Sequence, residues 1–383
     1  MTTGQTQVVD FGKRSGLKVH PVSIGAMRLP EDDDQAVSLL RQAIDAGMVY
    51  IDTSRGYGDS EIKVGKALKD GYREKVILST KCSPWIRKVE PDDDHSAECT
   101  YKRIIESMQR LDVDYLDFYQ VWNINSRPRY EMATMKGGMV DGIKRAMKEG
   151  LVRHTGFTTH DNPEDVSQYI DEAEWCEAIL FTYNLLNPRY AENIAKAHEK
   201  GIATIVMNPL GGGMLAEDSP VIRAAVREAV GTDDIVEVAH RYLASNENID
   251  TIICGISKPS DITSTVANYA KPPLTRQEFD ALEKAMQEIS SGSMGFCTGC
   301  GYCLPCPQGI EIPIMMNVSY LANMLDVPRK AEYDFAWATG EGNPEPGALP
   351  SACIECGRCE SQCTQKLHIT EELKRLKRMF ECS

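Results

Sequence analysis

Two runs of four closely spaced cysteines near the end of the chain constrain its fold more than any other feature. The first run, CTGCGYCLPCP, places cysteines at 297, 300, 303 and 306. The second run, CIECGRCESQC, places them at 353, 356, 359 and 363. Sulfurs spaced in this way can converge on one inorganic core. The pattern is typical of bacterial [4Fe–4S] sites, in which the fourth cysteine of a run binds the other cluster.

The two runs therefore predict two [4Fe–4S] clusters with exchanged fourth ligands. We expect one cluster on Cys297, Cys300, Cys303 and Cys363, and the other on Cys353, Cys356, Cys359 and Cys306. A zinc ribbon or a set of disulfides are the alternatives, although neither usually gives two runs of four. The first run closes with two intervening residues instead of three, and Thr364 stands where a proline often follows. Neither departure removes a ligand.

Length and charge set limits on the rest of the chain. The 383 residues are enough for one large domain and one small one. A net charge of −14 makes nucleic acid or an anionic membrane a poor partner. No stretch approaches the ~20 apolar residues of a membrane span, and the N-terminus lacks the apolar core of a signal peptide. We expect a cytoplasmic protein.

The region before the cysteines alternates short β-branched runs with amphipathic helical stretches. A hairpin over Val8–Phe11 and Leu17–Val19 precedes eight strand–helix units. The candidate strands are Val22–Ile24, Val49–Asp52, Val76–Thr80, Tyr115–Val121, Val152–Phe157, Ala178–Thr182, Ile202–Met207 and Thr251–Cys254. Eight such units predict an α/β fold, the (β/α)8 TIM barrel. A doubly wound sheet is the alternative, but its GxGxxG turn is absent after the early strands.

We expect residues 1–289 to form this barrel and residues 290–383 to form a small α-rich, ferredoxin-like domain with two clusters. Within the barrel, three polar side chains follow successive strands. Asp52 and Tyr57 come at and after the second strand, and Lys81 ends the third. An ammonium near a phenol lowers the phenol's pKa, and a carboxylate holds the lysine in place. Such a tyrosine can give a proton to a carbonyl oxygen while hydride reaches the carbon.

The barrel resembles the aldo-keto reductase superfamily across residues 8–285. The matching motifs are IGAMRLP (24–30), IDTSRGYGDSE (51–61), LSTK (78–81), DYLDFY (114–119), VRHTGFTTH (152–160), YNLLNP (183–188), NPLGGG (208–213) and GISKPSDI (255–262). With its cysteine-rich tail, the whole chain resembles the subfamily that carries a C-terminal ferredoxin-like 4Fe–4S domain. The resemblance implies that Asp52, Tyr57 and Lys81 match three members of the catalytic tetrad, with Tyr57 as the general acid.

The fourth member of the tetrad does not match. Where the family usually has a histidine after the fourth strand, this chain has Trp122, followed by Asn123. Tryptophan can donate one N–H but cannot titrate. His160, at the end of the fifth strand, is a candidate helper, and an ordinary structural histidine is the competing interpretation.

The resemblance also implies a nicotinamide site. Its residues would be Met27, Arg28, Thr158, Tyr183, Asn208, Leu210, Gly212, Ser257 and Lys258. Asp261, however, stands where many members place an arginine against the 2′-phosphate of NADPH. A carboxylate there would repel that phosphate, which weakens a preference for NADP.

These observations predict an iron–sulfur oxidoreductase of the aldo-keto reductase type. It would reduce, or oxidise, a small carbonyl or alcohol-type organic substrate at the barrel mouth, with electrons passing through two [4Fe–4S] clusters. The donor could be NAD(P)H, a ferredoxin or another redox partner, and a flavin is an open possibility, because hydride carries two electrons and each cluster one. The alternatives are an electron-transfer or regulatory subunit with an inactive barrel, or clusters that only staple the tail.

Overall fold

In the computed structural model, the described residues are 8–85, 89–291, 297, 303–340, 343, 346–363 and 367–381. Eight parallel strands close into a barrel in the order β10-β3-β4-β5-β6-β7-β8-β9. Their bounds are β3 Val22–Gly25, β4 Tyr50–Asp52, β5 Ile77–Cys82, β6 Leu116–Ile124, β7 Val152–Thr159, β8 Ala178–Thr182, β9 Ala203–Met207 and β10 Thr251–Gly255. The predicted TIM barrel is therefore confirmed, and every residue of β5 and β6 is buried.

The predicted N-terminal hairpin forms, and it packs into the barrel core. Strands β1 (Val9–Phe11) and β2 (Leu17–Val19) pair antiparallel, with a short helix α1 (Gly12–Ser15) between them that was not predicted. The ring of Phe11 lies 5.2 Å from that of Tyr50 and 5.5 Å from that of Phe118. Gly12 has a φ of 60°, and a Cβ there would lie 2.5 Å from the backbone nitrogen of Ala203. Only glycine fits at this contact.

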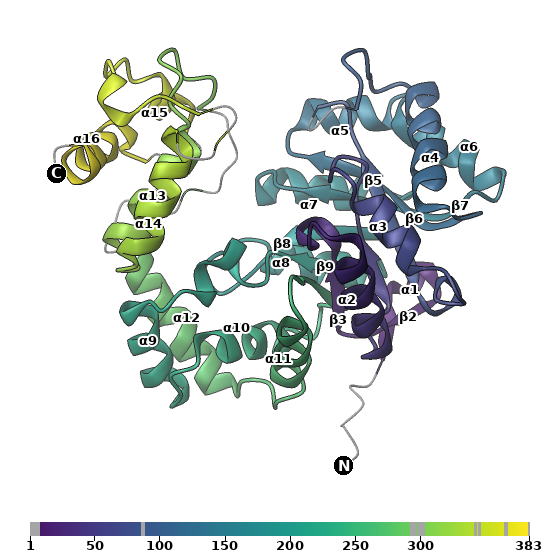
Figure 1. Cartoon of the computed structure of the whole chain (residues 1–383), viewed down its shortest axis with the longest axis horizontal. Coiled ribbons are helices and arrows are strands. Elements are labelled where there is room, and N and C mark those ends of the chain that lie inside the picture. Colours follow the sequence, from purple (N-terminus) through teal and green to yellow (C-terminus); the bar gives the residue numbers. More distant parts are fainter. Residues whose placement is uncertain are drawn as a thin grey trace. The chain divides into compact units, whose positions relative to one another are not determined.

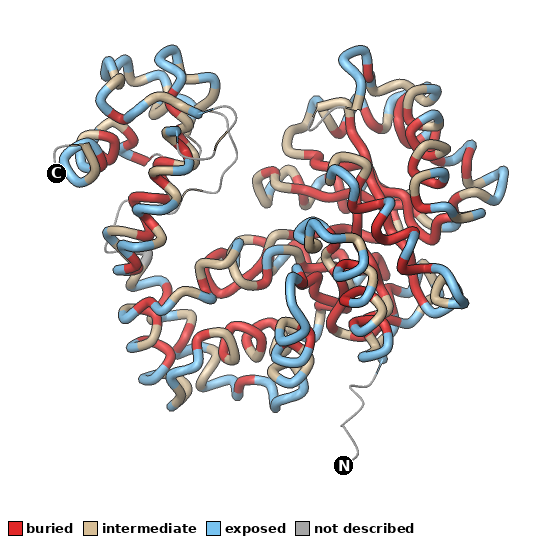
Figure 2. The backbone as a smooth tube through the Cα atoms, in the orientation of Figure 1, coloured by how far each residue is buried: buried red, intermediate tan, exposed pale blue. Residues whose placement is uncertain are grey.

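Helices alternate with the barrel strands. They are α2 Asp33–Asp45, α3 Ser60–Ala67, α4 Ala97–Leu111, α5 Arg127–Thr134, α6 Met139–Lys148, α7 Pro163–Glu172, α8 Ala191–Glu199, α10 Ile235–Ala244 and α11 Pro259–Tyr269. Figure 1 shows α3, α4 and α6 on the outside of the strands, and Figure 2 shows the buried residues concentrated in the barrel strands. Side chains mark several helix starts: Asp32 accepts from the backbone N–H of Gln35, and Ser96 accepts from that of Cys99.

The chain folds into two compact units. The first comprises residues 1–209 and 240–273, and the second residues 210–239 and 274–383. The second unit holds α9 (Pro220–Val230), α12 (Arg276–Ser291), α13 (Ile312–Asn323), α14 (Pro328–Thr339), α15 (Arg358–Gln362) and α16 (Ile369–Phe380). Its helical character agrees with the predicted α-rich C-terminal region, whereas the domain division at 289/290 stays a prediction. No helix in the described ranges is long and apolar enough to span a membrane.

Candidate active site and cysteine-lined pocket

A buried ion pair lies at the ends of β4 and β5. The Nζ of Lys81 lies 2.5 Å from Oδ2 of Asp52 and donates to the carbonyl of Thr53 at 2.9 Å. Only 2% of the Lys81 side chain is exposed. Burial opposes the charge on this lysine, but Asp52 and Tyr57 outweigh it and raise its pKa above the ordinary value. Burial likewise raises the pKa of Asp52, against the pull of Lys81. We conclude that Lys81 is charged at neutral pH.

Tyr57 contacts both this ion pair and the aromatic ring of Trp122. The Nζ of Lys81 is 4.8 Å from the centroid of the Tyr57 ring. The Trp122 ring packs edge-on against Tyr57, with the ring centroids 5.3 Å apart and an interplanar angle of 86°. Trp85 helps to hold Trp122 in place, because its Nε1 donates to the Trp122 carbonyl at 2.8 Å. The structure thus brings together four of the five predicted catalytic residues: Asp52, Tyr57, Lys81 and Trp122.

A bulge in β6 sets the position of Trp122. The β6–β7 register shifts between Val121 and Ile124. Within this irregular stretch Asn123 adopts a φ of 61°, which is uncommon for a residue other than glycine. Its backbone N–H donates to Oγ1 of Thr158 on β7 at 2.8 Å. Bulges of this kind re-aim a neighbouring side chain, and they occur often beside active sites.

His160, the fifth predicted catalytic residue, contacts a different set of side chains. Its Nδ1 lies 3.2 Å from Oγ1 of Thr182 at the end of β8, and its carbonyl accepts from the Arg189 guanidinium at 3.1 Å. Burial, and then the charge of Arg189, lower the pKa of His160 to about 4. The imidazole is therefore neutral at neutral pH, so an acidic role there is disfavoured.

Several of the predicted nicotinamide-site residues have internal partners. Thr158 accepts from Asn123, as described above. Tyr183 is 1% exposed, stacks on Tyr242 and donates to its hydroxyl at 3.0 Å. The side chain of Ser257 donates to Asp261 at 2.9 Å. A cofactor that bound to these three residues would have to share them with the hydrogen bonds and ring contacts that they already make within the protein.

The remaining nicotinamide-site residues lie at strand ends and in loops. Met27 is half exposed, and Asn208 and Lys258 are exposed. The Cδ of Arg28 lies 3.9 Å from the position that a Cβ of Gly255 would take at the end of β10. In the second unit, Leu210 is partly buried, and Gly212 has a φ of 72° inside the 3-10 helix Gly211–Ala216.

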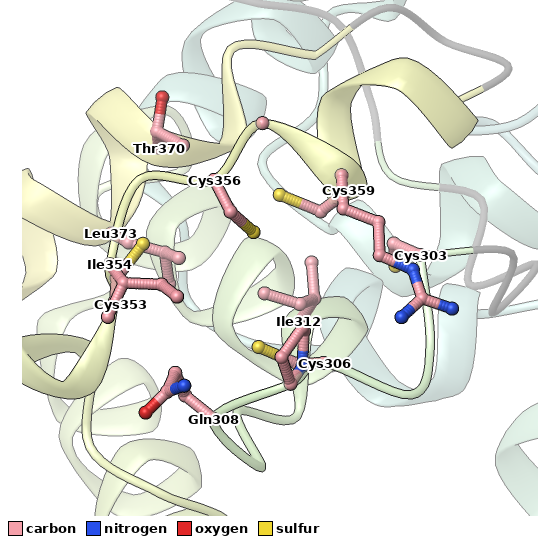
Figure 3. A pocket seen from close by; sticks show the side chains of 13 residues that line it. Cys303, Cys306, Gln308, Ile312, Cys353, Ile354, Cys356, Cys359, Thr370 and Leu373 are labelled. Carbon is pink, nitrogen blue, oxygen red and sulfur yellow. The ribbon is translucent and has the colours of Figure 1, made fainter.

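The C-terminal region contains a small cavity lined by five cysteines, namely Cys303, Cys306, Cys353, Cys356 and Cys359. Figure 3 shows Cys356 and Cys359 directing their sulfur atoms toward the same space, with Cys306 facing it from the first run. Four of the five are the predicted ligands of one cluster. Cys303, a predicted ligand of the other cluster, is the fifth. Cys297 and Cys363 are partly buried and are not among the lining residues, and Cys300 lies outside the described residues.

The residue types that line this cavity fit an iron–sulfur core, because cysteine thiolates hold such clusters. Within the described ranges, no three Cys, His, Asp or Glu side chains are placed to hold one metal ion, as a structural zinc site requires. Backbone amides donate to two of the sulfurs: the Glu355 N–H to Cys353 at 3.4 Å, and the Leu367 N–H to Cys363 at 3.5 Å. Hydrogen bonds to sulfur are among the features that tune iron–sulfur clusters.

Three cysteines outside the runs are structural. Cys82, Cys176 and Cys254 are buried, and burial raises the pKa of each thiol to about 12. They remain protonated at neutral pH and are poor metal ligands, because metals bind the thiolate.

Three residues of these sites were not among the predicted ones. Thr53 and Trp85 hold Lys81 and Trp122 in place, and Arg358 lines the cysteine cavity. Trp85 could have been found, because it follows Lys81 by four residues in a loop at the same barrel mouth. The Thr53 contact is made by its backbone carbonyl, which leaves no signal in the sequence.

A closed (β/α)8 barrel with this polar group at its strand ends, joined to a cysteine-rich helical region, defines the class of barrel oxidoreductases with an iron–sulfur domain. Comparison with known families agrees with this. The sequence model of the Aldo/keto reductase family matches residues 21–287, well over half of the chain, and the chain belongs to that family. The model of a 4Fe-4S dicluster domain matches residues 296–368.

The chain is similar to several curated oxidoreductases over its barrel. It is 28% identical to the L-galactose dehydrogenase of Arabidopsis thaliana over 280 residues, which cover 66% of this chain and 85% of the relative. It is 29% identical to the 6-dehydroglucose reductase of Novosphingobium aromaticivorans over 238 residues, covering 56% and 73%. The holo form of an aldo-keto reductase from Bacillus halodurans matches in structure with a TM-score of 0.63 at 24% identity, covering 73% of this chain and 96% of that one. This last likeness supports the fold.

Proposed function

We propose that the barrel reduces a small carbonyl compound, or oxidises the corresponding alcohol, with Tyr57 as the proton donor, and that two [4Fe–4S] clusters pass the electrons. The observation that carries the proposal is the contact of Tyr57 with the buried Lys81–Asp52 pair. A charged lysine beside a phenol stabilises the phenolate that forms when the proton leaves. Reduction of a carbonyl to an alcohol takes two electrons and two protons. Tyr57 would give one proton to the oxygen. The carbon would take the electron pair with its hydrogen as hydride from a nicotinamide, or, when the clusters supply one electron each, would take its proton from water.

Aromatic residues beside Tyr57 would form part of the substrate site. Trp122 presents an aromatic edge to Tyr57 at the place where the family usually has a histidine. Since an indole cannot titrate, Tyr57 and not Trp122 would give the proton to the carbonyl oxygen. We expect the aromatic side chains of Trp122 and Trp85 to contact the apolar part of the substrate.

The cysteines that line the cavity would hold one cluster, through Cys306, Cys353, Cys356 and Cys359, and Cys297, Cys300, Cys303 and Cys363 would hold the second. When bound, such clusters supply one-electron transfer at low potential. The cysteine loops would fix the clusters and limit their contact with water. Because two related enzymes carry sugar-derived names, small hydroxy-aldehydes are suitable first substrates.

The experiment is an aldehyde-reduction assay on the full-length protein, purified anaerobically with iron, sulfide, flavin and nicotinamide quantified. Glyceraldehyde is the probe, and NADH and reduced methyl viologen are the alternative donors. We expect Tyr57→Phe to lower turnover by about 10²–10⁴-fold without changing the iron content.

The matched control is Tyr72→Phe, because the Tyr72 hydroxyl donates to Asp45 away from the strand ends. That variant should turn over like the parent. A Tyr57→Phe enzyme as fast as the parent would remove the proposal.

A further inference from the structure

A buried carboxylate connects the segment that carries Tyr57 to the neighbouring barrel strand. Glu61 lies four residues after Tyr57, in the first turn of α3, and its side chain is fully buried. Its Oε1 accepts from the hydroxyl of Thr80 on β5 at 2.8 Å. Thr80 directly precedes Lys81 in the chain. Glu61 therefore joins the segment of the proposed proton donor to the strand that holds its lysine.

An arginine on α4 extends this connection. The Nε of Arg110 donates to Oε2 of Glu61 at 2.9 Å. Another nitrogen of the same guanidinium donates to the carbonyl of Gly58, the residue directly after Tyr57. A guanidinium is planar and holds its donors in a rigid fork. Arg110 therefore fixes the chain at two points, one residue and four residues after the tyrosine.

A second contact from α4 reaches the chain before Tyr57. Glu106 stands four residues before Arg110, and residues four apart share one face of a helix. The Oε2 of Glu106 lies 3.8 Å from the Nε of Arg55, two residues before the tyrosine. Both arginine side chains are largely shielded from water, with 22% of each exposed. The same face of α4 thus holds the Tyr57 segment on both sides of the tyrosine.

We propose that Arg110 and Glu61 are positioning residues for proton transfer, and that they act on the reaction through Tyr57. A catalytic group displaced by about 1 Å can lose about 10²-fold in rate, and these two side chains fix the tyrosine's segment against the strand of Lys81. The inference rests on the proposed function, in which Tyr57 gives the proton. The same contacts also stabilise the fold, and double variants separate the two roles.

The experiment measures kcat and KM for glyceraldehyde with the anaerobic full-length holoprotein. Arg110→Met should lower kcat by about 10–100-fold and change KM by less than about two-fold, because the loss falls on the transition state. Arg110→Lys keeps the charge and should recover part of kcat. In a Tyr57→Phe background, Arg110→Met should lower kcat no further, because the group that Arg110 positions has been removed.

A second double variant separates positioning from folding. Arg110→Met/Glu61→Gln removes both charges of the buried pair and keeps an amide oxygen that can accept from the Thr80 hydroxyl. It should regain most of the free energy of unfolding that Arg110→Met loses. Its kcat should stay low, because nothing replaces the bond from Arg110 to the Gly58 carbonyl.

The matched control is Arg73→Met, at the N-terminal ends of β5 and β6. The Arg73 guanidinium donates to the buried Asp117 at 2.8 Å and to the carbonyl of Tyr115 at 3.1 Å. It therefore makes the same kinds of contact as Arg110, but away from Tyr57. The folded fraction of this variant should keep the parental kcat.

Three results would overturn the inference. They are a parental kcat for Arg110→Met, an equal fall in kcat in the parent and Tyr57→Phe backgrounds, and a kcat that recovers together with stability in Arg110→Met/Glu61→Gln. A Tyr57→Phe enzyme as fast as the parent would instead remove the proposed function and the inference with it. A slow Tyr57→Phe enzyme beside a fast Arg110→Met enzyme would remove the inference alone.

Discussion

At the scale of single residues, the Lys81–Asp52 pair has the largest energetic consequence. Both side chains are almost fully buried, and they lie 2.5 Å apart. Removing one partner of a buried pair leaves an uncompensated charge in a medium of low dielectric constant. The pair is expected to matter for stability and, through Tyr57, for chemistry.

We therefore predict that Lys81→Met lowers the free energy of unfolding by about 3–5 kcal/mol. Chemical denaturation followed by circular dichroism measures this. The double variant Lys81→Met/Asp52→Asn, which removes both charges, should recover most of the loss and remain inactive. If the double variant were as unstable as the single one, the buried charge on Asp52 would not be the cause.

Much of this residue-level site could be predicted from sequence, and the reason is geometric. Asp52 and Lys81 end successive parallel strands, and such ends meet at one rim of a barrel. The place of His160 beside Thr182 and Arg189 could not be predicted in the same way. The position of His160 depends on contacts between the ends of β7 and β8, and the residues that make these contacts are well separated in the sequence.

At the scale of elements, the bulge in β6 decides where Trp122 points. Side-chain hydrogen bonds join the bulged stretch to β7, from the Asn123 N–H to the Thr158 hydroxyl and from the Thr159 hydroxyl to the Ile124 carbonyl. Such a register shift belongs to a pair of strands, so neither strand's sequence shows it. The strand predicted to end at Val121 in fact continues through the bulge to Ile124.

We predict that Thr158→Val, which removes the acceptor but keeps the shape, lowers the free energy of unfolding by about 1–3 kcal/mol. It should also change the near-ultraviolet circular dichroism, because the Trp122–Tyr57 contact depends on the bulge. Thr158→Ser keeps the hydroxyl and is the matched control. A parental spectrum and stability for Thr158→Val would contradict this role of the bulge.

The helices also differ in how clearly the sequence predicts them. Those on the outside of the barrel were predictable because apolar residues recur on one face. Helix α5 has a weaker signal, since it buries only Tyr130 and Ala133 in its eight residues and has a proline in its first turn. A short helix with few buried residues leaves a weak periodic signal.

At the scale of the whole molecule, the compact units do not follow the order of the chain. The unit that contains the cysteine-rich region also takes in residues 210–239, from before the last barrel strand. A domain boundary predicted from composition divides a sequence into continuous pieces. It therefore cannot show that one compact unit is built from two separate stretches of the chain. The chemistry assigned to each region was nevertheless readable, because cysteine spacing and strand-end residues are local signals.

The proposed function requires that electrons held by the C-terminal clusters reach a carbonyl substrate at Tyr57. The most direct measurement is a single turnover without nicotinamide. The anaerobic protein is reduced, freed of excess reductant and mixed with glyceraldehyde, while cluster absorbance and glycerol are followed together. We predict that the parent reoxidises its clusters as glycerol forms, and that Tyr57→Phe does so about 10²–10⁴-fold more slowly. Clusters that stay reduced in the parent, or that reoxidise equally fast in Tyr57→Phe, would contradict it.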